Sequence, residues 1–159
     1  MSEETSCLLP EVCAMLGIYA LYWKMDAALD ETDLAPRLGH TESRLLIQLD
    51  RPRRMGALAQ LLLTGAPSVT AAADKLEELA LVERMPDPDD RRALLLHLTE
   101  RGQQTRQQLQ NQVSELFRRI SGLTKSDIDQ FATLSMKIHD TILGQGARLS
   151  AQVPKGDSE

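Results

Sequence analysis

The chain has 159 residues, of which 42% are apolar and 26% charged, a size and composition typical of one globular domain. Aromatic residues make up only 3% of the chain, so the core has to be aliphatic, which favours helices over a β-sandwich. The net charge of −5 argues against a uniformly basic nucleic-acid coat, although residues 51–101 are neutral, with eight basic and eight acidic residues.

The N-terminal segment shows no sign of export or membrane anchoring. Its first residues are acidic where a signal peptide needs positive charge, and the apolar run at residues 12–23 is shorter than a bilayer span. Cys7 and Cys13 are too few for a disulfide framework. We therefore expect a cytoplasmic protein without a membrane partner.

Residues 12–29 predict a helix that is apolar on almost every side. The apolar positions are Val12, Met15, Leu16, Ile18, Tyr19, Leu21, Tyr22, Trp23 and Met25. A helix on the surface of a monomer has a single apolar stripe, so this pattern predicts burial against a second chain. Pro36 and Gly39 end the region.

The next forty residues predict three helices with tight connections. The helices are expected at residues 41–49, 55–63 and 68–80. Thr41 is a possible cap of the first, a break with Pro52 follows it, and a turn at residues 64–67 places Pro67 at the start of the third. The inward positions at helical spacing are Leu45, Leu46, Leu49, Leu58, Leu61, Leu62, Val69, Ala72, Ala73, Leu76, Leu79 and Ala80.

A β-hairpin is predicted after these helices. Its strands are expected at residues 82–86 and 92–98, joined by an acidic loop that contains proline. A one-turn helix is the competing interpretation of the leucine run in the second strand. The flanking prolines and the short length favour the strand.

The C-terminal third predicts two longer helices. The first starts at Thr99 or Glu100, runs to about Ile120 and ends at Gly122. Thr124 and Asp127 form an approximate capping box for the second, which we expect to end near Gly144. The two apolar stripes are Leu109, Val113, Leu116 and Ile120, and Ile128, Phe131, Leu134, Ile138 and Ile142. The polar residues 150–159 predict a flexible tail.

The order of helix, helix, tight turn, helix and hairpin is the outline of a winged helix-turn-helix. In that architecture the helix after the tight turn lies in the major groove of DNA. The outward face of this helix carries Pro67, Thr70, Ala71, Asp74, Lys75 and Glu78, with Ser68 at its start. Hydroxyl groups at these positions can contact bases or phosphates.

The tip of the hairpin carries two adjacent arginines. Arg91 and Arg92 can reach the neighbouring minor groove, where negative potential attracts arginine. The aspartates beside them are expected to hold an arginine or cap the turn, and they are Asp87, Asp89 and Asp90. Further candidates for contacts with the DNA backbone are Arg53, Arg54 and Arg84.

Residues 55–102 (MGALAQLLLTGAPSVTAAADKLEELALVERMPDPDDRRALLLHLTERG) resemble the core of the MarR (multiple antibiotic resistance regulator) family. The most telling pieces are SVT, DKLEELALVER and, after the acidic loop, DRRALLLHLTERG. The resemblance implies a mainly α-helical fold with a small β-hairpin: a winged helix-turn-helix of six helices with dimerisation helices at both termini. Dimerisation is then assigned to residues 1–40 and 100–149, DNA binding to residues 41–99 and the tail to residues 150–159.

The resemblance also implies a function and a set of site residues. Members are homodimeric transcriptional regulators, usually repressors of nearby genes, that bind palindromic double-stranded DNA and are not enzymes. Carried over by position, the DNA-binding residues are Ser68, Thr70, Ala71, Asp74 and Lys75 on the helix and Arg91 and Arg92 on the wing, with Asp90 in support. Many members carry a bulkier or basic residue where this chain has Ala71 and Ala72, so we expect fewer base contacts. A salt-bridge role is favoured for Asp74.

A small-molecule site is a further implication of the family. His40 falls at the junction of the dimerisation helices and the DNA-binding region, where members bind small aromatic or phenolic effectors. The other candidates for lining such a pocket are Tyr19, Tyr22, Trp23 and Met25. Packing in the core of a dimer is the alternative role for these residues.

Two other functions remain open on the sequence. A winged-helix module that binds protein instead of DNA would agree with the negative net charge and with Ala71. A redox-sensing regulator would use Cys7 or Cys13, although Cys13 lies in an apolar helix where packing is the favoured role. The three histidines lack metal-ligand spacing, and no catalytic constellation is visible, so we expect no metal, no cofactor and no enzymatic activity.

Overall fold

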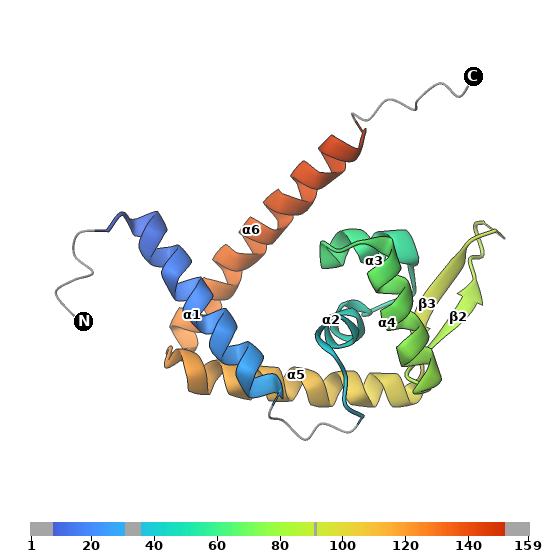
Figure 1. Ribbon diagram of the computed structural model, residues 1–159, viewed down its shortest axis with the longest axis horizontal. Coiled ribbons are helices and arrows are strands. Elements are labelled where there is room, and N and C mark those ends of the chain that lie inside the picture. The colour runs from blue at the N-terminus through green and yellow to red at the C-terminus, as the bar shows by residue number, and fades with distance from the viewer. Residues whose placement is uncertain (1–7, 31–35, 91, 152–159) are drawn as a thin grey trace.

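The computed structural model describes residues 8–30, 36–90 and 92–151, with side chains described up to residue 144 and that of residue 30 left out. Within these ranges six helices and a small antiparallel sheet form a head and a frame (Figure 1). The head contains α2 (His40–Gln48), α3 (Met55–Leu62), α4 (Ala66–Glu78), β1 (Arg53–Arg54), β2 (Val82–Pro86) and β3 (Leu94–Leu98). The frame contains α1 (Pro10–Asp30), α5 (Glu100–Ser121) and α6 (Lys125–Ala151).

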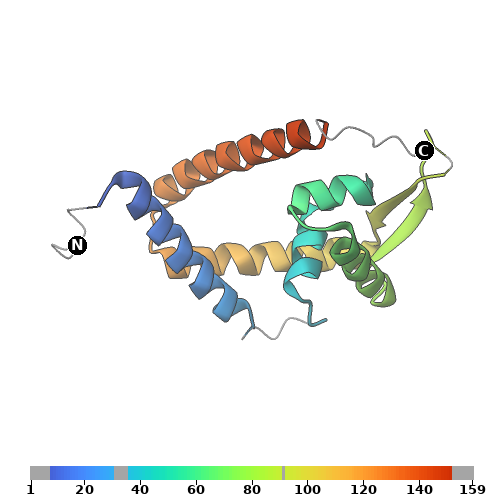
Figure 2. The ribbon, with the colours of Figure 1, turned by 45° about the horizontal axis from the view of Figure 1, so that its top comes forward.

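Helix α5 joins the two parts. Its first half lies beneath the head, and its second half crosses α1 (Figure 1). Helix α6 turns back from the far end of α5 and runs as a separate rod toward the side of the head (Figure 2). The aromatic rings of Phe117 in α5 and Phe131 in α6 lie 5.8 Å apart and hold this bend.

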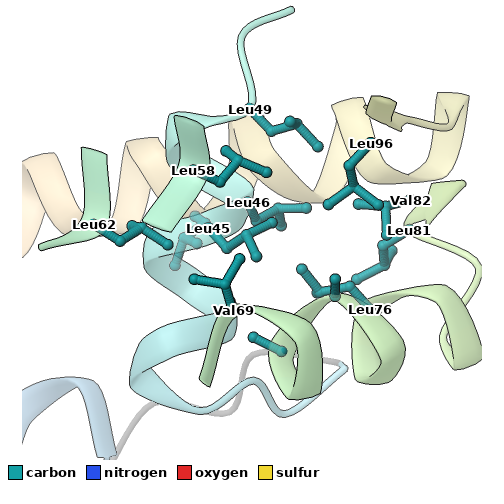
Figure 3. Packing of buried hydrophobic residues seen from close by; sticks show 13 residues of the cluster. Leu45, Leu46, Leu49, Leu58, Leu62, Val69, Leu76, Leu81, Val82 and Leu96 are labelled. Carbon is teal, nitrogen blue, oxygen red and sulfur yellow. The ribbon is translucent and has the colours of Figure 1, made fainter. Parts of the chain in front are cut away.

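The hydrophobic core lies inside the head and is built mainly from leucine (Figure 3). Its largest fully buried side chains are Leu45, Leu46, Leu49, Leu58, Leu62, Leu76, Leu81, Leu96, Val69 and Val82. Leu109 of α5 packs against this cluster and closes it from below. Burial of each leucine contributes about 1.5–3 kcal/mol, so these side chains account for most of the stability of the head. The inward faces predicted for α2 and α4 are confirmed, except that Ala80 is exposed and follows the helix.

The sheet contains a strand that the sequence did not predict. Strand β1 pairs with β3 through Arg53 and Leu96, and the strand order is β1-β3-β2. Two residues are too short for a visible alternation, so the segment was expected to be only a break. The predicted hairpin is confirmed, because β2 and β3 pair from Val82 with Leu98 to Pro86 with Leu94. The one-turn helix considered for the leucine run is therefore wrong.

The second strand of the hairpin starts at Leu94 and not at residue 92 as predicted. The backbone N–H of Ala93 donates to the carbonyl of Asp90, and the N–H of Asp87 donates to the carbonyl of Ala93. These bonds satisfy the backbone within a turn, which leaves Arg92 on the loop.

Several predicted helix ends are confirmed by their hydrogen bonds. The Thr99 side chain caps α5 by accepting from the N–H of Gly102 at 3.0 Å, and Gly122 ends the helix with a φ of 63°. At the start of α6, the Asp127 carboxylate accepts from the Thr124 N–H at 3.0 Å, and the Thr124 hydroxyl accepts from the Asp127 N–H at 3.3 Å. The Thr124 hydroxyl also donates to the Asp127 carboxylate at 2.5 Å, and this bond, followed by the bond from the Thr124 N–H, lowers the pKa of Asp127.

Other predicted ends were wrong. Helix α2 begins one residue earlier than expected, with Gly39 as its N-cap and Thr41 inside the helix. Helix α6 continues to Ala151, well past Gly144. A glycine inside a helix costs only about 1 kcal/mol relative to alanine, and no proline lies between Pro88 and Pro154 to end α6 earlier. The prediction of a flexible tail was therefore wrong for residues 150 and 151, and residues 152–159 lie outside the described part of the chain.

Helix α1 exposes most of its apolar surface in the single chain, so the burial against a second chain that its apolar pattern predicts stays a prediction. Over Pro10–Leu29 it is also long and apolar enough to cross a membrane by length and composition alone. The prediction that this segment is too short was therefore wrong, because the helix continues through Lys24 and Asp26 beyond the apolar run. Helix α1 packs against α5 and is therefore part of the frame. A helix that is covered on several sides by protein has the same apolar composition as a membrane span.

The head and α5 meet at a close backbone contact. The N–H of Thr99 donates to the carbonyl of Leu81 at 3.1 Å, and the Thr99 hydroxyl donates to the carbonyl of Ala80 at 2.8 Å. Gly102, one turn into α5, lies so close that a Cβ atom there would be 1.8 Å from the Leu81 carbonyl oxygen. Only glycine permits this approach, so the start of α5 has a fixed position under the sheet.

The substitution Gly102→Ala is expected to lower the free energy of unfolding by about 3 kcal/mol, because backbone must move to accommodate the new methyl group. Urea unfolding followed by circular dichroism measures this change. Gly56→Ala is the matched control: a Cβ atom there meets nothing within 4 Å, and the stability should stay level or rise by up to about 1 kcal/mol. Equal stability of Gly102→Ala and the unchanged protein would contradict the importance of this contact.

Candidate nucleic-acid interface

Helix α4 exposes one polar face to solvent because its opposite, apolar face packs in the core. Its buried residues are Val69, Ala72, Ala73 and Leu76. The positions predicted to face DNA are all exposed, namely Ser68, Thr70, Ala71, Asp74 and Lys75. Ala72 is only 2% exposed, in agreement with the inward face predicted for it, so of the two adjacent alanines only Ala71 is on the outward face. Ala71 is thus the small residue that lets a partner approach this face closely.

The charged residues on α4 are paired within the head. Asp74 lies 2.5 Å from Nη2 of Arg84 on β2, and Glu77 bonds to the other terminal nitrogen of the same guanidinium. Lys75 lies 3.4 Å from Glu78. The predicted salt bridge of Asp74 is therefore confirmed, and its partner, Arg84, lies on a strand of the wing.

The wing tip is organised by Asp87, which is 5% exposed. Its carboxylate accepts from Nε of Arg54 at 2.6 Å and from the backbone N–H of Asp89 at 2.9 Å. Asp90 accepts from the backbone N–H of Arg92 at 3.1 Å and lies 3.8 Å from Nη1 of Arg54. The loop aspartates thus cap the turn and hold an arginine, as predicted, but the arginine that they hold is Arg54.

The structure describes only one of the two arginines predicted at the wing tip. The side chain of Arg92 is exposed beside the turn. Arg91 lies outside the described residues, so its predicted role stays a prediction. The internal bonds of the described part of this loop leave the side chain of Arg92 exposed to solvent.

The three arginines that were candidates for contacts with the DNA backbone all have carboxylate partners in the chain. Arg53 binds Asp50 through Nε at 3.1 Å and Nη2 at 2.6 Å. Arg54 binds Asp87, and Arg84 binds the two acids of α4. These cations therefore neutralise neighbouring acids in the head.

The residues predicted to line an effector pocket lie on open surface in the single chain. Tyr19, Tyr22 and Trp23 are 55%, 61% and 67% exposed. His40 at the start of α2 lies 3.3 Å from Asp26 of α1, so it does stand at the junction of frame and head. Cys13 is partly exposed on α1, and Cys7 lies outside the described residues.

A hollow of about 290 Å³ lies elsewhere, where the end of α2, the end of β3 and the first turns of α5 meet. Its lining is mostly polar and consists of Leu49, Asp50, Arg51, Leu98, Gln103, Arg106 and Gln107. This place was not singled out by the sequence, because its residues come from three separate segments.

The wing tip is expected to loosen in acid. The N–H of Asp89 and the guanidinium of Arg54 lower the pKa of Asp87, with the N–H as the largest contributor. A carboxylate with a lowered pKa stabilises the fold fully above its unfolded value of about 3.9, and the stabilisation is lost as pH falls through the folded pKa. Hydrogen exchange at the Asp89 N–H, corrected for its intrinsic pH dependence, should show protection that falls below about pH 4.

The variant Asp87→Asn should remove this pH dependence and speed exchange at the Asp89 N–H roughly fivefold at neutral pH, because the charge-assisted bonds are lost. Asp129→Asn on α6 is the control and should behave like the unchanged protein. Protection that does not depend on pH in the unchanged protein would show that Asp87 does not hold the tip.

Comparisons with known proteins agree on one fold and one family. Residues 34–93 match the sequence profile of the MarR family. Curated proteins give no match to the chain. Solved structures that share its fold include the transcriptional regulator SlyA, with 14% identity, a TM-score of 0.70, and 86% of this chain and 98% of that chain covered.

Two further structures have higher identity. AbsC, a MarR family transcriptional regulator from Streptomyces coelicolor, has 24% identity, a TM-score of 0.66, and coverage of 86% of this chain and 97% of that chain. A mutant MarR from E. coli complexed with operator DNA has 24% identity, a TM-score of 0.61, and coverage of 76% and 89%. These likenesses show the fold, and the profile match covers the helix-turn-helix, β2 and the wing loop but ends before β3. Residues 34–93 thus carry the helix-turn-helix region of the MarR family, and the chain as a whole has the fold of MarR-family transcriptional regulators.

Proposed function

We propose that the protein is a cytoplasmic homodimer that binds palindromic operator DNA and represses nearby genes. The observation that carries the proposal is the exposed polar face of α4 beside a wing whose tip is internally braced. In this arrangement α4 enters the major groove and the wing reaches the adjacent minor groove. A mutant MarR from E. coli with the same fold is complexed with operator DNA, which supports operator DNA as the ligand.

The residues of α4 and of the wing have different roles in this proposal. Ser68 and Thr70 contact bases or phosphates, Ala71 permits close approach, and Lys75 contributes positive charge. Asp74 and Asp90 act in support, through Arg84 and through the wing turn. Arg91 and Arg92 enter the minor groove.

The dimer is formed by residues 1–40 and 100–149, and residues 41–99 bind DNA. Exposed large apolar side chains on α1 and α6 support this division, because isolated surface helices rarely expose so many. On α1 they include Leu16, Tyr19, Tyr22 and Trp23, and on α6 Leu134, Met136, Ile138 and Ile142. A two-fold axis through this surface can place two α4 helices about 34–36 Å apart, the spacing of successive major grooves.

A small aromatic or phenolic effector releases the DNA in this proposal. Tyr19, Tyr22, Trp23 and His40 form its site together with the partner chain, since they are exposed in the single chain at the junction of α1 and α2. The pair between Asp26 and His40 links frame and head at that point. An effector that binds one spacing of the heads more tightly than the other shifts the population away from the DNA-bound form.

Loss of an exposed wing arginine should weaken DNA binding. Arg92→Ala is expected to lower affinity for the protein's own upstream DNA about tenfold and to reduce the slope of log affinity against log salt by about 0.9, the value for one phosphate contact. Fluorescence anisotropy at several salt concentrations measures both. Arg91→Ala is expected to behave similarly.

Lys125→Ala is the control for charge, because Lys125 is 90% exposed at the start of α6, at the far end of α5 from α4 (Figure 1). It should leave both quantities nearly unchanged. If a folded dimer binds no DNA at low salt, the protein is instead a winged-helix module for protein partners, and the pairing of its head arginines with acids would then be their whole role.

A charge placed on the apolar face of α6 should separate the subunits. Ile138→Glu is expected to weaken dimerisation at least a hundredfold, because the carboxylate would be buried without a partner. Sedimentation equilibrium measures the dissociation constant. Ser126→Glu, on an exposed polar position of the first turn, should leave the dimer intact. A monomeric unchanged protein at micromolar concentration would refute the proposed dimer.

A further inference from the structure

We propose that Arg84 makes DNA binding possible by neutralising the carboxylates of Asp74 and Glu77 on α4, and that it does not itself contact DNA. The inference rests on the proposed DNA-binding role of α4 and adds a residue whose effect is exerted through the protein's own acids. Such a residue does not touch the DNA, so a search for residues in contact with DNA would not find it.

The geometry places one guanidinium against two acids from successive turns of the helix. Helix α4 and strand β2 pack against each other at the edge of the head (Figure 1). The Arg84 Nη2 atom donates to Oδ1 of Asp74 at 2.5 Å, and its Nη1 atom donates to Oε2 of Glu77. The hydrogen bond to Asp74 is the largest contribution that raises the pKa of Arg84 above its usual value.

This pairing occupies the arginine and leaves it poorly placed for a phosphate. Its side chain is only 24% exposed, whereas those of Asp74 and Glu77 are 54% and 40% exposed. Both terminal nitrogens already donate to carboxylates. The charge of this guanidinium is already matched by two carboxylates, so a phosphate gains less from it than from an unpaired arginine.

The charge balance of α4 shows why neutralisation matters. The helix carries Asp74, Glu77 and Glu78 against a single cation, Lys75, which pairs with Glu78. Two carboxylates would therefore face incoming DNA without compensation if β2 did not supply Arg84. DNA carries one negative charge per about 1.7 Å of its axis, so two free carboxylates beside it weaken binding to every sequence.

Arg84 also determines what Asp74 can do at the protein surface. A free carboxylate on a helix in the major groove can accept a hydrogen bond from the amino group of cytosine. In this structure Oδ1 of that carboxylate is bonded to Arg84, and the guanidinium balances its negative charge. Arg84 thus prevents Asp74 from selecting a base, and the helix face reads DNA through its hydroxyl groups and small side chains.

A charge-restoring pair of variants tests the inference. Arg84→Met removes the cation but keeps much of the apolar stem, and it should lower affinity for upstream DNA about fivefold to tenfold. The double variant Arg84→Met with Glu77→Gln returns the local charge to its original value. Its affinity should recover to within about twofold of the unchanged protein, with the same salt slope throughout, because the number of phosphates contacted is unchanged.

Thermal unfolding of each variant verifies that the head is intact, and Lys125→Met controls for the loss of one positive charge from the whole chain. A lower salt slope in Arg84→Met that Glu77→Gln does not restore would show a direct phosphate contact and overturn the inference. Low affinity in the folded double variant at an unchanged slope would also overturn it, in favour of a purely structural brace. No DNA binding by the unchanged protein at low salt would defeat the proposed function as well.

Discussion

The contact between the first turn of α5 and the backbone at Leu81 is the constraint on which the rest of the structure depends. The core of the head is built from α2, α3, α4 and the sheet, and the frame is built from long helices with few buried side chains of their own. The hydrogen bonds of Thr99 and the close approach of Gly102 join the two at the root of the wing. Any change in the direction of α5 is therefore transmitted to the base of the hairpin and to the end of α4.

Several acidic side chains of the head are neutralised by ion pairs with arginines of the same chain. Its arginines are placed opposite acids that would otherwise face a polyanion, and three of them are held by carboxylates of the same chain. This arrangement explains how a protein with a net charge of −5 can present a surface suited to DNA. The paired charges set the background potential of the head, and the proposed DNA contacts are left to the exposed hydroxyls of α4 and to Arg92.

The frame has the opposite character. Its apolar side chains on α1 and α6 are exposed in the single chain, and the aromatic residues of α1 are part of this surface. A partner subunit that covers them would also enclose the junction of Asp26 and His40. Dimerisation and the response to an effector would then depend on the same surface, which gives a physical route from a small ligand to the spacing of the two heads.

The sequence by itself determined the helices, the hairpin and the outward face of α4, because periodicity, caps and turn residues are local signals. The Thr99 cap, the Gly122 stop and the exposed position of Ala71 all follow from neighbours in the chain. Strand β1 and the partners of Arg54 and Arg84 were decided only by tertiary structure, since each joins segments far apart in sequence. A short strand has no pattern of its own, and an arginine can pair with any acid that the fold brings within reach. The chain thus encodes its elements locally, and the packing of those elements selects which charges are paired and which remain exposed to DNA.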